Sequence, residues 1–190
     1  MTIKLFGVNV MISPLFFPLI TFLLIVDKFG TAVPVISALL LHELGHIIAI
    51  KLIGQKIWNV KLLPSAVVMG YSSYNRFAGD IFVALAGVLA NSVALFSAII
   101  LEQILSLELT YFVAANICIG GLNLLPFEGL DGGTVLNLVF KGKLAIKKGI
   151  TLAFLLIFTL GIMALFKKYG INLSAVAFAV YIFATFLFKV

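Results

Sequence analysis

The chain is poor in side chains on which most soluble or secreted proteins depend. Only one of its 190 residues is a cysteine, so an internal disulfide framework is excluded. Charged residues make up 11% of the sequence, whereas a typical soluble domain has about 25%. There are only two histidines and seven acidic residues. A catalytic or metal site therefore has few residues from which to be built.

Hydrophobic residues are correspondingly abundant, at 63% of the sequence. A soluble globule of this size could not bury so much apolar surface, so we expect lipid to cover part of it. A spanning helix needs about 20 apolar residues, which favours an all-α multi-pass membrane protein without a sizeable extramembrane domain. The six candidate transmembrane helices are residues 10–26, 31–53, 80–101, 110–125, 150–166 and 171–188.

The basic residues are unevenly distributed between the two sides of these spans. Ten of the thirteen lie on the side of the N-terminus: Lys4, Lys51, Lys56, Lys61, Arg76, Lys141, Lys143, Lys147, Lys148 and Lys189. The other three are Lys28, Lys167 and Lys168. The positive-inside rule then predicts an integral protein of the cell membrane with both termini in the cytoplasm. We interpret the net charge of +6 in this way and expect no nucleic acid partner.

The connection between the second and third spans is predicted to form a short β-hairpin. Apolar residues recur at every second position on both sides of Pro64 and Ser65, which is typical of strands. These residues are Trp58, Val60 and Leu62, then Val67, Met69 and Tyr71. Two interpretations stay open: a hairpin anchored at the membrane interface by its aromatic residues, or a sheet edge that pairs with an extended peptide.

The second span contains the sequence His42-Glu43-Leu44-Gly45-His46. Residues four apart lie on one face of a helix, so both imidazoles can reach one metal ion. Glu43 lies beside them and can act as a general base on a water molecule, as in zinc metalloproteases. A heme or proton-relay pair is the competing interpretation, but it gives Glu43 no task. Ionisable residues inside a membrane are costly and mark functional sites, so we predict a zinc hydrolase site.

A catalytic zinc ion is normally held by three protein ligands, and no third histidine remains. Among the acids, Asp131 follows the fourth span in a segment broken by proline and glycines, where irregular backbone usually lines a site. Its alternative role is to cap a short helix over residues 132–140. Glu128 is the second candidate ligand. Asp80 is expected to cap the third span, and Cys118 to be a packing residue.

These motifs resemble the site-2 protease family of intramembrane zinc metalloproteases, nearest to its sporulation-type branch (stage IV sporulation protein FB). The resemblance implies that His42, His46 and Asp131 are the zinc ligands and that Glu43 is the catalytic acid and base. It rests on the motif of the second span and on the later segment from Asn123 to Gly132.

Two positions depart from the family pattern: Val88 and Gly129 stand where the family has proline. The resemblance covers roughly residues 10–140, with two further spans over residues 150–188. We expect residues 1–190 to form a single domain without the PDZ or CBS domain that the family often adds.

The predicted function is hydrolysis of peptide bonds in membrane-embedded or membrane-associated proteins, as in regulated proteolysis of a pro-sigma or anti-sigma factor. Asn91 or Asn123 can bind substrate or the developing oxyanion, or can instead join helices by hydrogen bonds. The expected partners are the substrate, the lipid bilayer and an inhibitory or regulatory membrane protein. The alternatives are a catalytically inactive protein that binds membrane clients and a zinc-handling membrane protein.

Overall fold

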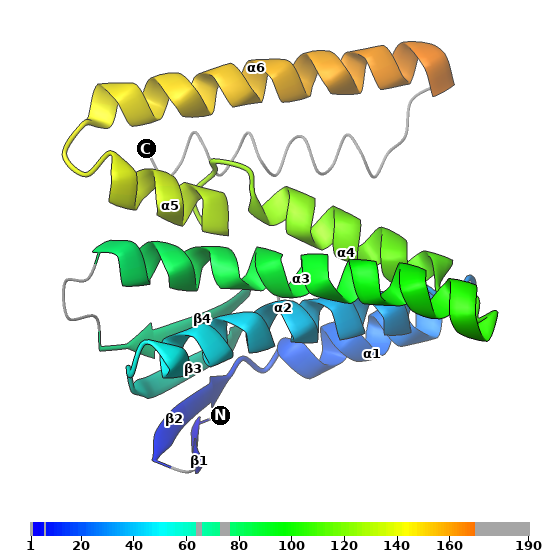
Figure 1. Ribbon diagram of the computed structural model, residues 1–190, viewed down its shortest axis with the longest axis horizontal. Helices are drawn as coiled ribbons and strands as arrows, with labels where there is room; N and C mark the ends of the chain where they lie inside the picture. The colour runs from blue at the N-terminus through cyan, green and yellow to red at the C-terminus, as the bar shows by residue number, and fades with distance from the viewer. Residues whose placement is uncertain (1, 6, 64–65, 73–76, 170–190) are drawn as a thin grey trace. The chain divides into compact units, whose positions relative to one another are not determined.

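The computed structural model describes residues 2–5, 7–63, 66–72 and 77–169 (Figure 1). It is mostly helical and carries one four-stranded mixed sheet. In chain order its elements are β1 (Thr2–Leu5), β2 (Val8–Ile12), α1 (Phe16–Val26), α2 (Ala32–Leu52), β3 (Ile57–Leu63), β4 (Ala66–Tyr71), α3 (Phe77–Leu105), α4 (Thr110–Asn123), α5 (Asp131–Val139) and α6 (Leu144–Tyr169).

The N-terminal strands correct the prediction of an all-α protein. Residues 10–12, predicted as the start of the first span, belong to β2, and only α1 remains of that span as a helix. Val8, Val10 and Ile12 are partly buried while the residues between them are exposed, which is the period of a strand. In the sequence, this short alternation continues directly into the long apolar run of α1, which hides it.

The predicted hairpin is confirmed as β3 and β4. Val60 pairs with Met69 and Leu62 with Val67 in antiparallel register, while the turn at residues 64–65 lies outside the described part of the chain. The sheet order is β1-β2-β3-β4 with β2 parallel to β3, so β4 is an outer strand. This order places Lys4 of β1 and Lys61 of β3 in one sheet.

The first compact unit, Met1–Gly121, has α2 packed along α3 as its main helix pair (Figure 1). The buried residues of α2 recur three or four positions apart and so form one stripe: Ala38, His42, Gly45, Ala49 and Ile50. A Cβ atom at Gly45 would lie 2.5 Å from the carbonyl oxygen of Ala86, so glycine is required for this close approach. The predicted second span is confirmed as a helix, and the third is contained within α3.

Asp80 does not cap α3, because the helix begins three residues earlier, at Phe77. Asp80 lies in the first turn instead and accepts a hydrogen bond from the hydroxyl of Tyr71 at 3.2 Å. Burial, together with the Asp80 carboxylate, raises the pKa of Tyr71 to about 12. The contact joins the end of β4 to the start of α3.

The start of α2 is capped by Asp27, a residue that the sequence analysis left unassigned. Its carboxylate accepts hydrogen bonds from the backbone of Ala32 at 2.7 Å and from the hydroxyl of Thr31 at 3.0 Å. The hydrogen bond from Ala32 is the main reason that the pKa of Asp27 lies below its usual value. A carboxylate at this end also complements the helix dipole, so it helps to fix where α2 begins.

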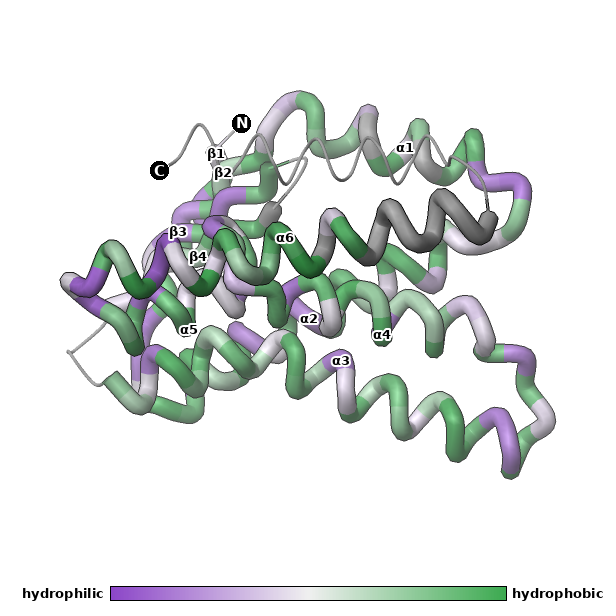
Figure 2. Tube along the Cα trace, turned by 90° about the horizontal axis from the view of Figure 1, so that it is seen from above, coloured by the Kyte–Doolittle hydropathy of each residue, from purple (hydrophilic) through white to green (hydrophobic). Residues whose placement is uncertain are grey.

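Among the described helices, α2 and α3 are long and apolar enough to cross a membrane. Figure 2 shows that hydrophobic residues run along α3 and that hydrophilic ones gather in the connections. In the second unit, Leu122–Val190, α6 contains the predicted fifth span at residues 150–166. The predicted sixth span, residues 171–188, lies outside the described residues.

Candidate metal centre

The two histidines of α2 point their rings at one another from adjacent turns. The Nε2 atoms of His42 and His46 lie 3.2 Å apart, and the rings meet edge to face at 81°. His42 is buried and His46 partly buried. The helix therefore directs one nitrogen of each ring toward a common point, as the spacing in the sequence predicts.

The outer nitrogen of His46 is held by the backbone of α3. Its Nδ1 lies 2.8 Å from the carbonyl oxygen of Val83. A carbonyl oxygen only accepts hydrogen bonds, so the Nδ1–H of His46 is the donor. In the neutral ring, the proton is then on Nδ1 and Nε2 keeps its lone pair.

Asn91 holds His42 in the same way. The side-chain nitrogen of Asn91 lies 3.0 Å from the carbonyl oxygen of Ala38. Because that carbonyl must accept, the orientation of the Asn91 amide is fixed and its Oδ1 faces the Nδ1 of His42 at 2.6 Å. His42 therefore also donates from Nδ1, and its Nε2 keeps its lone pair.

Two imidazole lone pairs thus face each other at 3.2 Å, an arrangement that a cation between them would stabilise. Two nitrogens bound to one tetrahedral zinc ion at about 2.0–2.1 Å each would be about 3.3 Å apart. The observed separation agrees with this value. The hydrogen bonds from the outer nitrogens are also those that usually orient metal-binding histidines. The histidine pair therefore fits a metal ion of the zinc type.

Gly87 of α3 leaves space for an ion at this point. A Cβ atom at Gly87 would lie 2.5 Å from Nε2 of His46 and 2.6 Å from Nε2 of His42. Real Cβ atoms essentially never lie so close to another atom, so a side chain at residue 87 would displace the two imidazole rings. The role of Gly87 cannot be read from the sequence, because it depends on how closely α3 approaches α2.

The other predicted site residues differ in how far they are buried. Glu43 is partly buried between the two histidines in the sequence of α2, and Asn123 is partly buried at the end of α4. In the second unit, Asp131 is the partly buried first residue of α5 and Leu130 occupies the N-cap position. The interpretation of Asp131 as the cap is therefore wrong. Glu128 is exposed.

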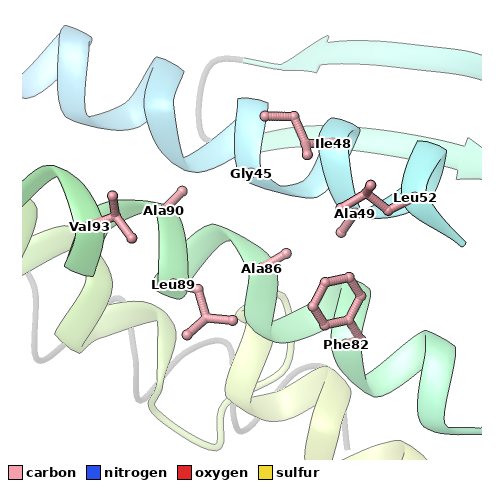
Figure 3. A pocket seen from close by; sticks show the side chains of 9 residues that line it. All are labelled: Gly45, Ile48, Ala49, Leu52, Phe82, Ala86, Leu89, Ala90 and Val93. Carbon is pink, nitrogen blue, oxygen red and sulfur yellow. The ribbon is translucent and has the colours of Figure 1, made fainter.

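A groove between α2 and α3 is a separate feature (Figure 3). Neither histidine lines it, and its surface is almost wholly apolar. It offers no ligand to a metal ion, so it is not the metal centre. Its lining residues are Gly45, Ile48, Ala49, Leu52, Phe82, Ala86, Leu89, Ala90 and Val93.

Comparison with known structures identifies the fold. The chain is similar to a solved structure described as a site-2 protease from Methanocaldococcus jannaschii, with a TM-score of 0.65 over 98% of this chain and 94% of that one. The chain has the fold of a site-2 protease. The two sequences are 23% identical, so this likeness concerns the fold alone.

The chain also has a relative by sequence. The chain is 25% identical over 188 residues to a protein named zinc metalloprotease MJ0392, also from Methanocaldococcus jannaschii. The match covers 95% of this chain but 52% of the relative, so the chain spans about half the length of that protein. No protein-family model matches the chain.

Proposed function

We propose that the protein is a zinc-dependent endopeptidase that cleaves membrane-embedded or membrane-associated proteins. The observation that carries this proposal is the arrangement of the two imidazole rings. Their Nε2 atoms lie 3.2 Å apart, and the Nδ1 atom of each ring is hydrogen-bonded. Such a pair within a HExxH helix is the ligand arrangement of zinc hydrolases. The relative named a zinc metalloprotease supports the choice of metal and reaction.

Asp131 is the proposed third ligand. The two histidines come from α2 of the first unit, and Asp131 is the partly buried first residue of α5 in the second. Two imidazoles and one carboxylate form a common ligand set for catalytic zinc. The exposure of Glu128 speaks against the competing candidate.

In the proposed reaction, each residue has a defined task. A bound zinc ion would supply Lewis-acid activation of a water molecule and of the scissile carbonyl. Glu43 accepts the proton of the attacking water and passes it to the leaving amine. Asn91 already donates both its amide hydrogens, to Ala38 and Asn116, so we assign it to holding His42. Asn123 is the remaining candidate donor to the oxyanion.

Zinc removal tests the function as a whole. We expect the purified protein to cleave an unwound membrane peptide, to lose this activity in a strong chelator and to regain it when zinc is added. Binding of the peptide without cleavage, with or without zinc, would favour the inactive client-binding alternative. Zinc uptake into vesicles without cleavage would favour a zinc-handling protein.

The choice of third ligand is tested by comparing two acids. Asp131→Ala is expected to reduce bound zinc from one ion per chain to a small fraction, because a ligand is lost from the coordination sphere. Glu128→Ala should leave zinc content unchanged. Metal analysis of both purified variants decides between them, and the reverse result would assign the ligand to Glu128.

The proposed topology has about six spans and cytoplasmic termini. In a Cys118→Ser background, Lys143→Cys should react with a water-soluble thiol reagent only from the cytoplasmic side. Lys28→Cys should react only from outside. Both positions are exposed. Labelling on the opposite sides would reverse the orientation deduced from the lysine distribution.

The finer proposal is membership of the sporulation-type branch, with a pro-sigma or anti-sigma factor as substrate and a membrane protein as regulator. It is supported by the motifs at His42 to His46 and Asn123 to Gly132. Co-expression with a membrane-tethered sigma factor precursor should release a shortened product. If this substrate stays intact while another membrane peptide is cleaved, the sporulation-type assignment is wrong.

A further inference from the structure

Two asparagines are fully buried in helices of the first unit. Asn91 of α3 is 1% exposed and Asn116 of α4 is 2% exposed. A buried amide is costly unless its polar atoms are hydrogen-bonded. Neither lies in a loop or at the sheet, so their hydrogen bonds must come from the helices themselves. These hydrogen bonds lead from α4 toward the histidines.

The hydrogen bonds form a directed chain. Asn116 donates from Nδ2 to the carbonyl oxygen of Phe112 at 2.8 Å, which leaves its Oδ1 to accept. Oδ1 accepts from Nδ2 of Asn91 at 2.8 Å, and Oδ1 of Asn91 in turn accepts from His42. Each carbonyl fixes the orientation of the next amide, so the chain ends by fixing which nitrogen of His42 carries the proton.

The packing of α4 keeps this chain short. Gly120 follows Asn116 by four residues and therefore lies on the same face of α4. A Cβ atom at Gly120 would lie 3.4 Å from Cβ of Asn91. This close approach allows the side chain of Asn116 to reach Asn91 directly. Since α4 contributes none of the proposed ligands, its link to the histidines is through this contact.

We propose that Asn116 is a positioning residue of the metal centre, acting through Asn91 on the proton of His42. The proposal rests on the proposed function, because it assumes that Nε2 of His42 binds the metal. Without Asn116, one amide hydrogen of Asn91 loses its acceptor, and only Ala38 and His42 still hold the orientation of the amide. A rotated Asn91 would present its NH₂ group to His42 and drive the proton to Nε2, where it blocks metal binding.

The test compares zinc affinity in a set of variants, measured by competition with a chromogenic chelator. Asn116→Leu keeps the side-chain volume but removes the hydrogen bonds. It should weaken zinc binding roughly tenfold, which is the lower end of the loss seen when a group that orients a metal ligand is removed. Asn91→Leu should weaken it more. The double variant should bind zinc as Asn91→Leu does, since Asn116 acts only through Asn91. Asn116→Asp keeps an acceptor and should restore most of the affinity.

Ser92→Ala is the matched control, because the Ser92 hydroxyl donates within its own helix, to Val88 at 2.9 Å. It should leave zinc affinity unchanged. An Asn116→Leu variant with a lower melting temperature but unchanged zinc affinity would overturn the proposal. So would additive losses in the double variant. If Asn116→Leu does not fold, Asn116→Ala, which also removes the acceptor, takes its place in both comparisons.

A second measurement separates this inference from the proposed function. The chain has only two histidines, so nitrogen NMR of the metal-free protein reports each ring. In the parent protein we expect the single ring proton of His42 on Nδ1. In Asn116→Leu we expect a mixture of two tautomers, with this proton on Nδ1 in some molecules and on Nε2 in the others. If this change occurs in a protein that binds no zinc, the proposed function fails and the positioning role stands. An unchanged His42 signal would refute the positioning role whatever the zinc content.

Discussion

Glu43→Gln is expected to abolish peptide cleavage while the protein still binds one zinc ion. Glutamine keeps the shape of the side chain but cannot accept the proton of the attacking water. General base catalysis typically contributes about 10²–10⁴-fold to a rate, so activity should fall by at least that factor. Asn91 and Val83 accept hydrogen bonds from the two imidazoles. Both contacts remain in the variant, and zinc should therefore stay. Peptide cleavage and metal content are measured on the same preparation.

Glu128→Gln provides the control for the same chemical change at an exposed site. It should retain both activity and zinc. If Glu43→Gln loses zinc together with activity, Glu43 is itself a ligand and the assignment of general base is wrong. If it retains activity, another group accepts the proton and the proposed mechanism fails at its central step.

The helix that carries both histidines could be predicted because the pattern that specifies it is local. A single apolar run contains α2, and the spacing of His42 and His46 determines that their rings share a face. The hairpin was predicted for the same reason, since alternation along β3 and β4 is visible within each strand. These features need no knowledge of which segments meet in space.

The features that were missed depend on such long-range contacts. β2 pairs with β3 across some 50 residues, and its five-residue alternation was too short to stand out beside the apolar run of α1. Asn116 looks like any polar residue in an apolar helix until its partner on α3 is known. Val83 contributes only a backbone carbonyl, which every residue has. The second layer of the site was therefore beyond prediction from sequence.

Gly87 is the residue whose role depends most completely on this packing, and Gly87→Ala is expected to remove zinc from the protein. The added methyl group would lie within 2.6 Å of the Nε2 atoms of both histidines, in the space that an ion needs. Zinc content should fall from one ion per chain to a small fraction, and cleavage should fall with it. Metal analysis after purification in zinc-containing buffer measures the first effect directly.

Gly121→Ala is the matched control, because it makes the same substitution in α4 with no atom within 4 Å of the new Cβ. Replacing a helical glycine by alanine removes a penalty of about 1 kcal/mol, so Gly121→Ala should gain stability and keep its zinc. Gly87→Ala changes the intrinsic helix preference by the same amount as Gly121→Ala. A loss of zinc from Gly87→Ala alone must therefore come from the methyl group beside the histidines. If Gly87→Ala instead retained one zinc ion per chain, the metal would not lie between the two imidazole nitrogens, and the proposed centre would have to be rebuilt around another set of ligands.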